Sequence, residues 1–256
     1  MLSKNRKKLI DSLRLQKYRQ REGLFVAEGV KLVDELLASL LKTVSVFATM
    51  EWIAGNKHSA KLHNLEVVEI DQHELAKIST LATPNQVLAV ARIPDLSLPG
   101  SLKGKWVLAL DQIRDPGNLG TIIRTADWFG IDCIVAANGS VDIWNPKVVQ
   151  ASMGSVFRMP VYYVDMPQFL EEHSKEMPVY GTLLEGQDVT KLKFAHDGIV
   201  VVGNESHGIS ESVMPFISEK ITIPSAAGAG RGGAESLNAS IATAVICYEI
   251  RRQFST

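Results

Sequence analysis

The sequence predicts an α/β protein with two domains, of which the C-terminal one has a mostly parallel sheet with helices on both faces. Short apolar runs alternate with helical apolar patterns through the second half of the chain, as parallel strands joined by crossover helices require. The chain has 256 residues, enough for two small domains. A segment near residue 100 is rich in proline, glycine and serine, which is typical of a linker.

The N-terminal part alternates short helices and strands. Residues 1–20 carry basic side chains and apolar positions at helical spacing, which predicts one amphipathic helix. The segments predicted after it are a strand at 23–29, a helix through 32–40, strand Val44–Ala48, a helix near Trp52, strand Leu65–Ile70, a helix at His73–Ile78 and strand Val87–Arg92. This pattern predicts a small α/β domain and indicates no chemistry.

Positive charge is concentrated at the N-terminus, although the formal net charge of the chain is only −1. Residues 1–22 carry eight basic side chains and two acidic ones. A local basic surface of this kind suits a polyphosphate partner, and a solvated helix surface explains it equally well. The candidates for contact with such a partner are Lys4, Arg6, Lys7, Lys8 and Arg14.

The C-terminal part contains six predicted strands. Residues 93–104 hold the prolines, glycines and serines of the linker, so we place the domains at 1–95 and 105–256 with the linker at 96–104. The predicted strands are Trp106–Leu110, Ile131–Ala136, Val161–Val164, Val179–Leu184, Ile199–Val202 and Ile221–Ile223. Sites in such sheets lie beyond the carboxyl ends of the strands, so the loops that follow these strands are the candidates.

Three of these loops are rich in polar residues and glycine. The first, residues 111–120, leads into a predicted helix at Thr121–Phe129 that Asn118 is expected to cap. The second is residues 203–208. The third, residues 224–238, ends where Ser236 is expected to cap a C-terminal helix with apolar residues at helical spacing. Backbone N–H groups are unpaired at a helix start, so this third loop could hold a polar ligand.

Glycines in the third loop satisfy the dinucleotide pattern G-x-G-x-x-G at Gly228, Gly230 and Gly233. The fingerprint also needs an acidic residue at the end of a second strand about 20 residues later. Glu249 lies within the predicted helix and the sequence ends at Thr256. We therefore reject a nicotinamide-dependent oxidoreductase and interpret residues 225–234 as a glycine-rich loop.

Composition excludes several classes of protein. With 46% hydrophobic and 21% charged residues, the chain is an ordinary globular protein. No apolar run approaches the length of a membrane span, and no apolar region follows the basic N-terminus, so we expect neither a membrane anchor nor a secretory signal, and a cytoplasmic location. Cys133 and Cys247 lie in apolar contexts without a C-x-x-C pair, which predicts buried thiols and no metal site.

Taken together, DPGNLGTIIRTADWFG, VVVGNESHGIS and ESLNAS resemble motifs 1, 2 and 3 of the SpoU (TrmH-type) branch of the SPOUT RNA methyltransferases. The resemblance covers roughly residues 105–253. The N-terminal domain, with FVAEGVKLVDELL, resembles the L30e-like substrate-binding domain of many members. The resemblance implies transfer of a methyl group from S-adenosylmethionine to a ribose 2′-hydroxyl of RNA, a deep trefoil knot and a homodimer that completes the site.

The resemblance also implies roles for individual residues. The polar positions of the three motifs, expected to be catalytic, are Asn118, Arg124, Glu205, Ser236 and Asn238. The expected cofactor contacts are Thr182, Leu183, Gly203, Asn204, Gly208, Ile223, Leu237 and Asn238. A guanidinium is always protonated and has no acceptor, so we expect Arg124 to bind an RNA phosphate and steer the hydroxyl. Ser236 and Asn238 could instead serve only as helix caps.

The chain departs from the family pattern at two places. Ten residues lie between Pro224 and Glu235 where the family usually has about four, which puts the exact cofactor contacts in doubt. His207 is individual to this sequence, and we interpret it as a solvated loop residue. An L30e-like module favours ribosomal RNA over transfer RNA, because such modules recognise RNA shape. A tRNA 2′-O-methyltransferase and a catalytically silent RNA-binding relative stay open as alternatives.

Overall fold

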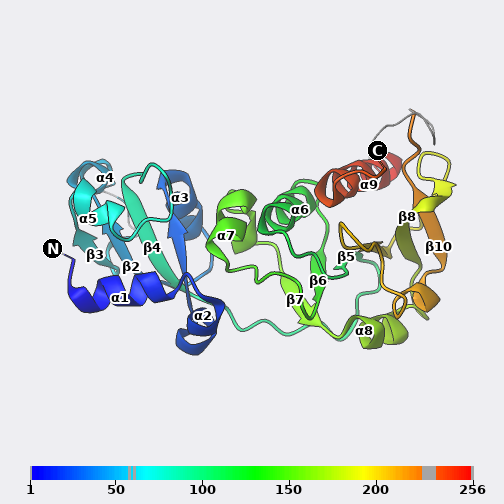
Figure 1. Cartoon of the computed structure of the whole chain (residues 1–256), viewed down its shortest axis with the longest axis horizontal. Helices are drawn as coiled ribbons and strands as arrows, with labels where there is room; N and C mark the ends of the chain where they lie inside the picture. The colour runs from blue at the N-terminus through cyan, green and yellow to red at the C-terminus, as the bar shows by residue number, and fades with distance from the viewer. Residues whose placement is uncertain (1, 57–58, 60–61, 227–234, 255–256) are drawn as a thin grey trace. The chain divides into compact units, whose positions relative to one another are not determined.

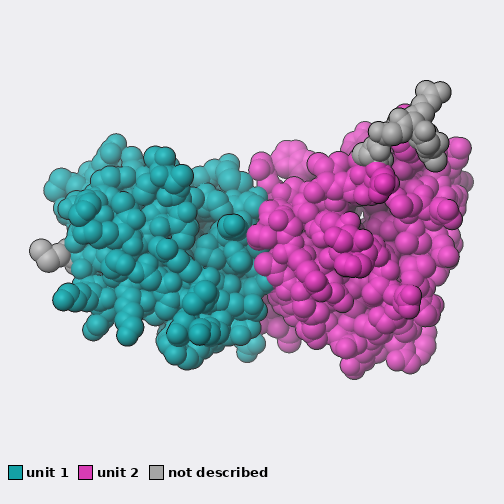
Figure 2. Space-filling model, viewed as in Figure 1, with its two compact units in different colours: residues 1–95, 142–158 teal, residues 96–141, 159–256 magenta. Residues whose placement is uncertain are grey.

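The computed structural model describes residues 2–56, 59, 62–226 and 235–254 (Figure 1). By their internal contacts these residues form two compact units, coloured separately in Figure 2. Unit 1 comprises residues 1–95 together with 142–158, and unit 2 comprises residues 96–141 and 159–256. Segment 142–158 therefore packs with the N-terminal unit, although it follows two strands of unit 2 along the chain.

Unit 1 is built on a four-stranded mixed sheet in the order β1-β4-β2-β3. Strand β4 pairs antiparallel with both β1 and β2, whereas β2 and β3 are parallel. The strands are β1 (Leu24–Glu28), β2 (Thr43–Ala48), β3 (Glu66–Glu69) and β4 (Val87–Arg92), and the helices are α1 (Lys4–Ser12), α2 (Gln16–Glu22), α3 (Val30–Ala38), α4 (Met50–Gly55), α5 (Gln72–Ala76) and α7 (Pro146–Ser152). The small α/β domain predicted from the sequence is therefore present.

The predicted single helix over residues 1–20 is wrong, because the chain breaks between α1 and α2. Leu15 has extended backbone angles, φ −99° and ψ 130°. The carbonyl oxygens of Leu13 and Arg14 accept hydrogen bonds from Arg19 Nη1, at 2.8 and 2.9 Å. A buried guanidinium thus satisfies the carbonyls at the break, and the periodicity of the apolar residues gave no sign of it.

Segment 142–158 is held to unit 1 by charge and by aromatic stacking. Arg19 is only 2% exposed, and its guanidinium pairs with the carboxylate of Asp142 at 2.6 Å. The ring of Phe25 on β1 stacks on Trp144, with 4.2 Å between the ring centroids. An ion pair with so little solvent contact is stable only because its hydrogen bonds are complete.

Unit 2 contains one six-stranded sheet in the order β10-β8-β9-β5-β6-β7, and every neighbouring pair is parallel. The strands are β5 (Trp106–Leu110), β6 (Cys133–Ala137), β7 (Val161–Val164), β8 (Val179–Asp188), β9 (Gly198–Val202) and β10 (Glu219–Thr222), and the helices are α6 (Pro116–Trp128), α8 (Met166–His173) and α9 (Ala239–Phe254). Strands β5, β6 and β9 are buried along their whole length, as central strands covered on both faces must be.

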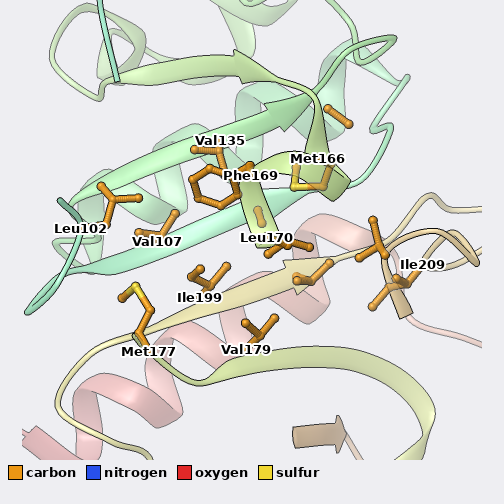
Figure 3. Close-up of a cluster of buried hydrophobic side chains, with 14 of the residues drawn as sticks. Leu102, Val107, Val135, Met166, Phe169, Leu170, Met177, Val179, Ile199 and Ile209 are labelled. Carbon is orange, nitrogen blue, oxygen red and sulfur yellow. The ribbon is translucent and has the colours of Figure 1, made fainter. Parts of the chain in front are cut away.

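One hydrophobic cluster of unit 2 lies between the sheet and α8 (Figure 3). Met166, Phe169 and Leu170 of α8 pack there on the apolar side chains of the central strands. Helices α6 and α9 lie on the other side of the sheet in Figure 1. This architecture confirms the predicted fold class. The trefoil knot stays a prediction.

None of the helices within the described residues is long and apolar enough to cross a membrane.

Candidate active site

Three loops that are far apart in the sequence meet at the carboxyl edge of the unit 2 sheet. Asn118, in the first turn of α6, donates a hydrogen bond from Nδ2 to Glu205 Oε1 at 2.6 Å. Its Oδ1 accepts a hydrogen bond from Asn238 Nδ2 at 2.9 Å. The same amide thus links a residue of each of the other two loops. We call Asn118, Glu205 and Asn238 the three-loop cluster.

A second contact joins the first two loops. Asn204 donates from Nδ2 to the carbonyl oxygen of Gln112 at 2.8 Å, and its Oδ1 accepts from the backbone N–H of Ser206 at 2.9 Å. Asn204 and Gly208 also exchange two backbone hydrogen bonds of 2.9 Å. At the base of this loop, Asp111 is buried and accepts from the N–H of Ser210 at 2.7 Å. The second loop is therefore fixed at both of its ends.

A cavity of about 750 Å³ opens beside this loop. Its size is within the range of small-molecule sites. The lining includes all of the predicted cofactor residues except Asn238, together with Glu205 and Ser236: Thr182, Leu183, Gly203, Asn204, Glu205, Gly208, Ile223, Ser236 and Leu237. The lining also includes apolar residues such as Leu183, Ile209 and Ile246 beside polar ones, as a site for a partly apolar ligand requires.

A register jump between β8 and β10 shapes one wall of this cavity. Lys220 pairs with Gly181, but the next residue, Ile221, pairs with Gln187. The residues between Gly181 and Gln187 on β8 therefore have no partner on β10, and Thr182 to Glu185 line the cavity instead. The hydroxyl of Thr222 holds this outward bend by donating to the carbonyl oxygen of Leu184 at 3.0 Å.

A glycine allows the second loop to fold back closely at the end of β9. A Cβ atom on Gly203 would lie 2.3 Å from the carbonyl carbon of Gly208 and 2.4 Å from the backbone nitrogen of Ile209. These atoms belong to the backbone and cannot turn aside. Position 203 therefore tolerates no side chain in this conformation.

The predictions that Asn118 caps α6 and that Ser236 caps α9 are wrong, whereas the alternative that Asn238 serves as a helix cap agrees with the structure. Asp115 caps α6, because its Oδ1 accepts from the N–H of Asn118 at 2.8 Å, and Pro116 takes the first helical position. Asn238 rather than Ser236 stands before α9, and its Oδ1 accepts from the N–H and the hydroxyl of Ser240 at 2.9 and 2.7 Å. The side-chain amide of Asn118 is thus free of capping and available to the three-loop cluster.

Arg124 lies outside the three-loop cluster. It is six residues beyond Asn118 on α6, about 9 Å along the helix axis at a rise of 1.5 Å per residue. The residue is exposed, and within the described part of the chain its guanidinium has no hydrogen-bond or ion-pair partner. The predicted roles of the site residues stay predictions.

The predicted RNA-contacting residues belong to unit 1 and differ in how free their charges are. Arg6 pairs with Glu66, and both Lys7 and Arg14 pair with Asp11. Lys4 and Lys8 are exposed. Part of the basic surface expected from the sequence is therefore balanced by carboxylates of the same unit.

The two cysteines are buried thiols, as predicted. Burial raises the pKa of Cys133 to about 11 and the pKa of Cys247 to about 12. Both thiols are therefore protonated at ordinary pH and unsuited to nucleophilic chemistry. The described residues contain no cluster of His, Cys, Asp and Glu that could hold a metal ion.

Sequence reasoning missed Asp111, Gln112 and Asp115 at the site. Asp115 could have been found, since an aspartate directly before a proline is a frequent helix start. Gln112 has φ +60°, a left-handed conformation that few residues other than glycine adopt. Its sequence context shows no glycine or asparagine that would have indicated this conformation.

The sheet of unit 2 is all parallel, and a cavity and polar loops lie at the carboxyl edge of its strands. These features define the class of α/β proteins that bind a small molecule at this edge. The chain belongs to the SpoU rRNA methylase family, whose model matches residues 105–248. Residues 4–89 match an MRM3-like substrate-binding domain. The family predicted from the three motifs is confirmed.

Several known proteins resemble the chain over almost its whole length. The 23S rRNA (guanosine(2553)-2′-O)-methyltransferase RlmP of Bacillus subtilis is 30% identical, with 93% of each chain covered. A solved structure described as an RNA methyltransferase of the TrmH family, from Porphyromonas gingivalis, is 39% identical with a TM-score of 0.87 and 99% coverage of both chains. An AdoMet-bound rRNA methyltransferase from Sinorhizobium meliloti is 27% identical with a TM-score of 0.86, covering 100% of this chain and 97% of its own.

Proposed function

We propose that this protein transfers a methyl group from S-adenosylmethionine to a ribose 2′-hydroxyl of ribosomal RNA. The observation that carries the proposal is the three-loop cluster, in which Asn118 binds both Glu205 and Asn238 beside a cavity of about 750 Å³. Family membership and the relatives named as 23S rRNA 2′-O-methyltransferases support the same activity.

The cavity fits the proposed cofactor. Leu183, Ile223 and Leu237 offer apolar contacts for an adenine ring, and the backbone at Gly203 comes close to the cavity because no side chain intervenes. Leu237 is 50% exposed in this chain, so a bound adenine ring could cover its exposed apolar surface. When bound, S-adenosylmethionine supplies an electrophilic methyl group on a sulfonium.

In the proposed mechanism the residues of the chain position the RNA and exclude water. Asn238 and Ser236 would bind the target ribose, while Glu205 holds the second loop through Asn118. Arg124 would bind an RNA phosphate and orient the hydroxyl, because a guanidinium has no acceptor for the proton. Orientation of the two reacting groups supplies a large part of the rate in such transfers.

We further propose a homodimer that brings Arg124 to the site. Helix α9 carries an exposed apolar stripe, with Ile241 51%, Val245 37% and Tyr248 57% exposed. Trp128 on α6 is 84% exposed and lies one helical turn from Arg124, on the same face. A second copy would cover this stripe. A monomer in sedimentation velocity at micromolar concentrations would contradict this part of the proposal.

Methyl transfer to purified RNA tests the proposed activity. Ribosomal and transfer RNA from cells that lack this gene would be incubated with labelled S-adenosylmethionine, and the 2′-O-methylated nucleotides would then be mapped. We expect label at a defined position in ribosomal RNA. Label in transfer RNA alone would favour a tRNA methyltransferase. Absence of any heat of S-adenosylmethionine binding in calorimetry would favour the silent relative.

The predicted cytoplasmic location is kept as part of the proposal. Recovery of the protein with the ribosomes of a fractionated cell would agree with it, whereas recovery only in a membrane or organelle fraction would not.

A further inference from the structure

Arg114 lies on the first loop between the two contacts that join this loop to the second. On one side of it, the carbonyl oxygen of Gln112 accepts from Asn204, and on the other side Asn118 binds Glu205. Arg114 is exposed. Its position in the chain therefore places it at the rim of the three-loop cluster.

The orientation of Arg114 depends on Gln112. The side-chain Oε1 of Gln112 accepts a hydrogen bond from Arg114 Nη2 at 3.0 Å. Gln112 itself has φ +60°, and its carbonyl oxygen is held at 2.8 Å by Asn204. A non-glycine residue keeps this backbone conformation only where its surroundings impose it, which is common at functional sites. The second loop thus fixes Gln112, and Gln112 in turn holds the guanidinium.

Three carboxylates of the first two loops each accept a hydrogen bond from a donor other than Arg114. Asp111 accepts from the N–H of Ser210, Asp115 accepts from the N–H of Asn118, and Glu205 accepts from the amide of Asn118. None of them forms an ion pair with Arg114 within the described residues. The hydrogen-bond partner of Arg114 is a neutral amide, so within the described residues no carboxylate neutralises its positive charge.

The start of α6 does not offer a competing site for an anion. The carboxylate of Asp115 already occupies it as the helix cap. With carboxylates at positions 111, 115 and 205 nearby, a polyanion can approach this rim only where a cation offsets their repulsion. Arg114 is a cation at this rim, it is held by Gln112, and it has no ion-pair partner among the residues that the structure describes.

We propose that Arg114 binds a phosphate of the RNA backbone next to the target ribose, with Gln112 as the residue that positions it. This inference rests on the proposed function and adds a phosphate subsite to it. A guanidinium can donate two parallel hydrogen bonds to a phosphate. The fixed position of Arg114 would set the register of the RNA strand against the three-loop cluster.

Steady-state methyl transfer with Arg114→Gln tests the inference. We expect KM for the RNA to rise about tenfold, as for loss of one charge-assisted contact, with kcat within about twofold and the affinity for S-adenosylmethionine unchanged. The slope of RNA binding against the logarithm of salt concentration should fall by about one. Lys103→Gln is the matched control, since it removes one exposed charge before β5, at the opposite edge of the sheet.

Two further variants test separately the positive charge at residue 114 and the position in which Gln112 holds it. Arg114→Lys keeps the charge without the fork, and we expect about half of the loss in logarithmic terms. Gln112→Ala should raise KM for the RNA without changing the salt slope, because the charge remains. If Arg114→Gln behaves like Lys103→Gln while the wild type methylates RNA, this inference is overturned and the proposed function stands. If the wild type transfers no methyl group to any RNA, the proposed function fails first.

Discussion

At the scale of single residues, Arg124 offers the sharpest test of the mechanism. Its guanidinium is protonated at any ordinary pH, so it can bind a phosphate and orient a hydroxyl but not remove a proton. We expect Arg124→Lys to lower kcat at least about tenfold, because a point charge cannot make the paired contact. The pH dependence of kcat should keep its shape. Single-turnover rates between pH 6 and 10 would measure both.

Two outcomes would contradict this role of Arg124. Retention of most of the turnover in Arg124→Lys would make the fork unnecessary. Loss of a titration step from the pH profile would instead show that Arg124 takes the proton. Lys103→Gln serves again as a control for a general loss of surface charge, since Lys103 is exposed and precedes β5.

The sequence allowed the three-loop cluster to be predicted as a set but not in its details. Asn118, Glu205 and Asn238 each follow a strand, and parallel strands bring their carboxyl ends to the same edge of a sheet. Which side chain caps a helix is decided locally among competing residues. Asp115 and Asn238 are the caps, although Asn118 and Ser236 are equally suitable types.

At the scale of elements, the turn from β9 into the second loop depends on Gly203. We expect Gly203→Ala to lower the free energy of unfolding by about 1–3 kcal/mol, as overpacking does, because its Cβ would lie 2.3 Å from backbone. S-adenosylmethionine affinity should fall as well, since the shifted loop lines the cavity. Urea unfolding and calorimetry would measure the two effects.

Gly100→Ala is the matched control for this substitution. A Cβ at Gly100 would meet nothing within 4 Å, so its stability and its affinity for the cofactor should stay close to those of the wild type. Equal behaviour of the two variants would show that the second loop can move aside without cost.

The apolar patterns in the sequence predicted most of the strands and helices. They failed where contacts with distant parts of the chain determine the local structure. The register jump between Lys220 and Ile221 leaves no mark in the alternation of apolar residues, since it depends on the partner strand. The apolar stripe of the last helix was predicted correctly as a stripe. In the folded chain it faces outward, because Ala239, Thr243, Ile246, Cys247 and Ile250 form the buried face of α9.

At the scale of the whole molecule, the Arg19–Asp142 ion pair holds segment 142–158 to unit 1. We expect Arg19→Met to lower the free energy of unfolding by about 3–5 kcal/mol, because it leaves the Asp142 carboxylate, which is only 13% exposed, without its partner. Two carbonyl oxygens also lose their donor. Hydrogen exchange measured by mass spectrometry should become faster in residues 142–158.

A second substitution checks that the uncompensated charge is the cause. Arg19→Met combined with Asp142→Asn should be more stable than Arg19→Met alone, because asparagine is neutral and can still accept from the N–H of Trp144. Arg21→Met removes a mostly exposed ion pair with Glu22 and should cost less than about 1 kcal/mol. A cost as large as that of Arg19→Met would mean that burial is not what matters.

The division of the chain into units was only partly open to prediction. The proline and glycine residues at 93–104 mark the first crossing between units, and the contacts place it at Asp95. The return of residues 142–158 to unit 1 depends on Arg19, Phe25 and their distant partners. The predicted domain boundaries, 1–95 and 105–256, stay a prediction.

This return has a consequence for synthesis of the protein. Unit 1 needs residues up to Arg158, which are translated 63 residues after Asp95. At about 5–20 residues per second, the ribosome takes roughly 3–13 s to make them. During that interval the ring of Phe25 lacks Trp144 and Phe157, on which it stacks in the finished fold. Until residues 142–158 have been made, the nascent unit 1 is therefore incomplete.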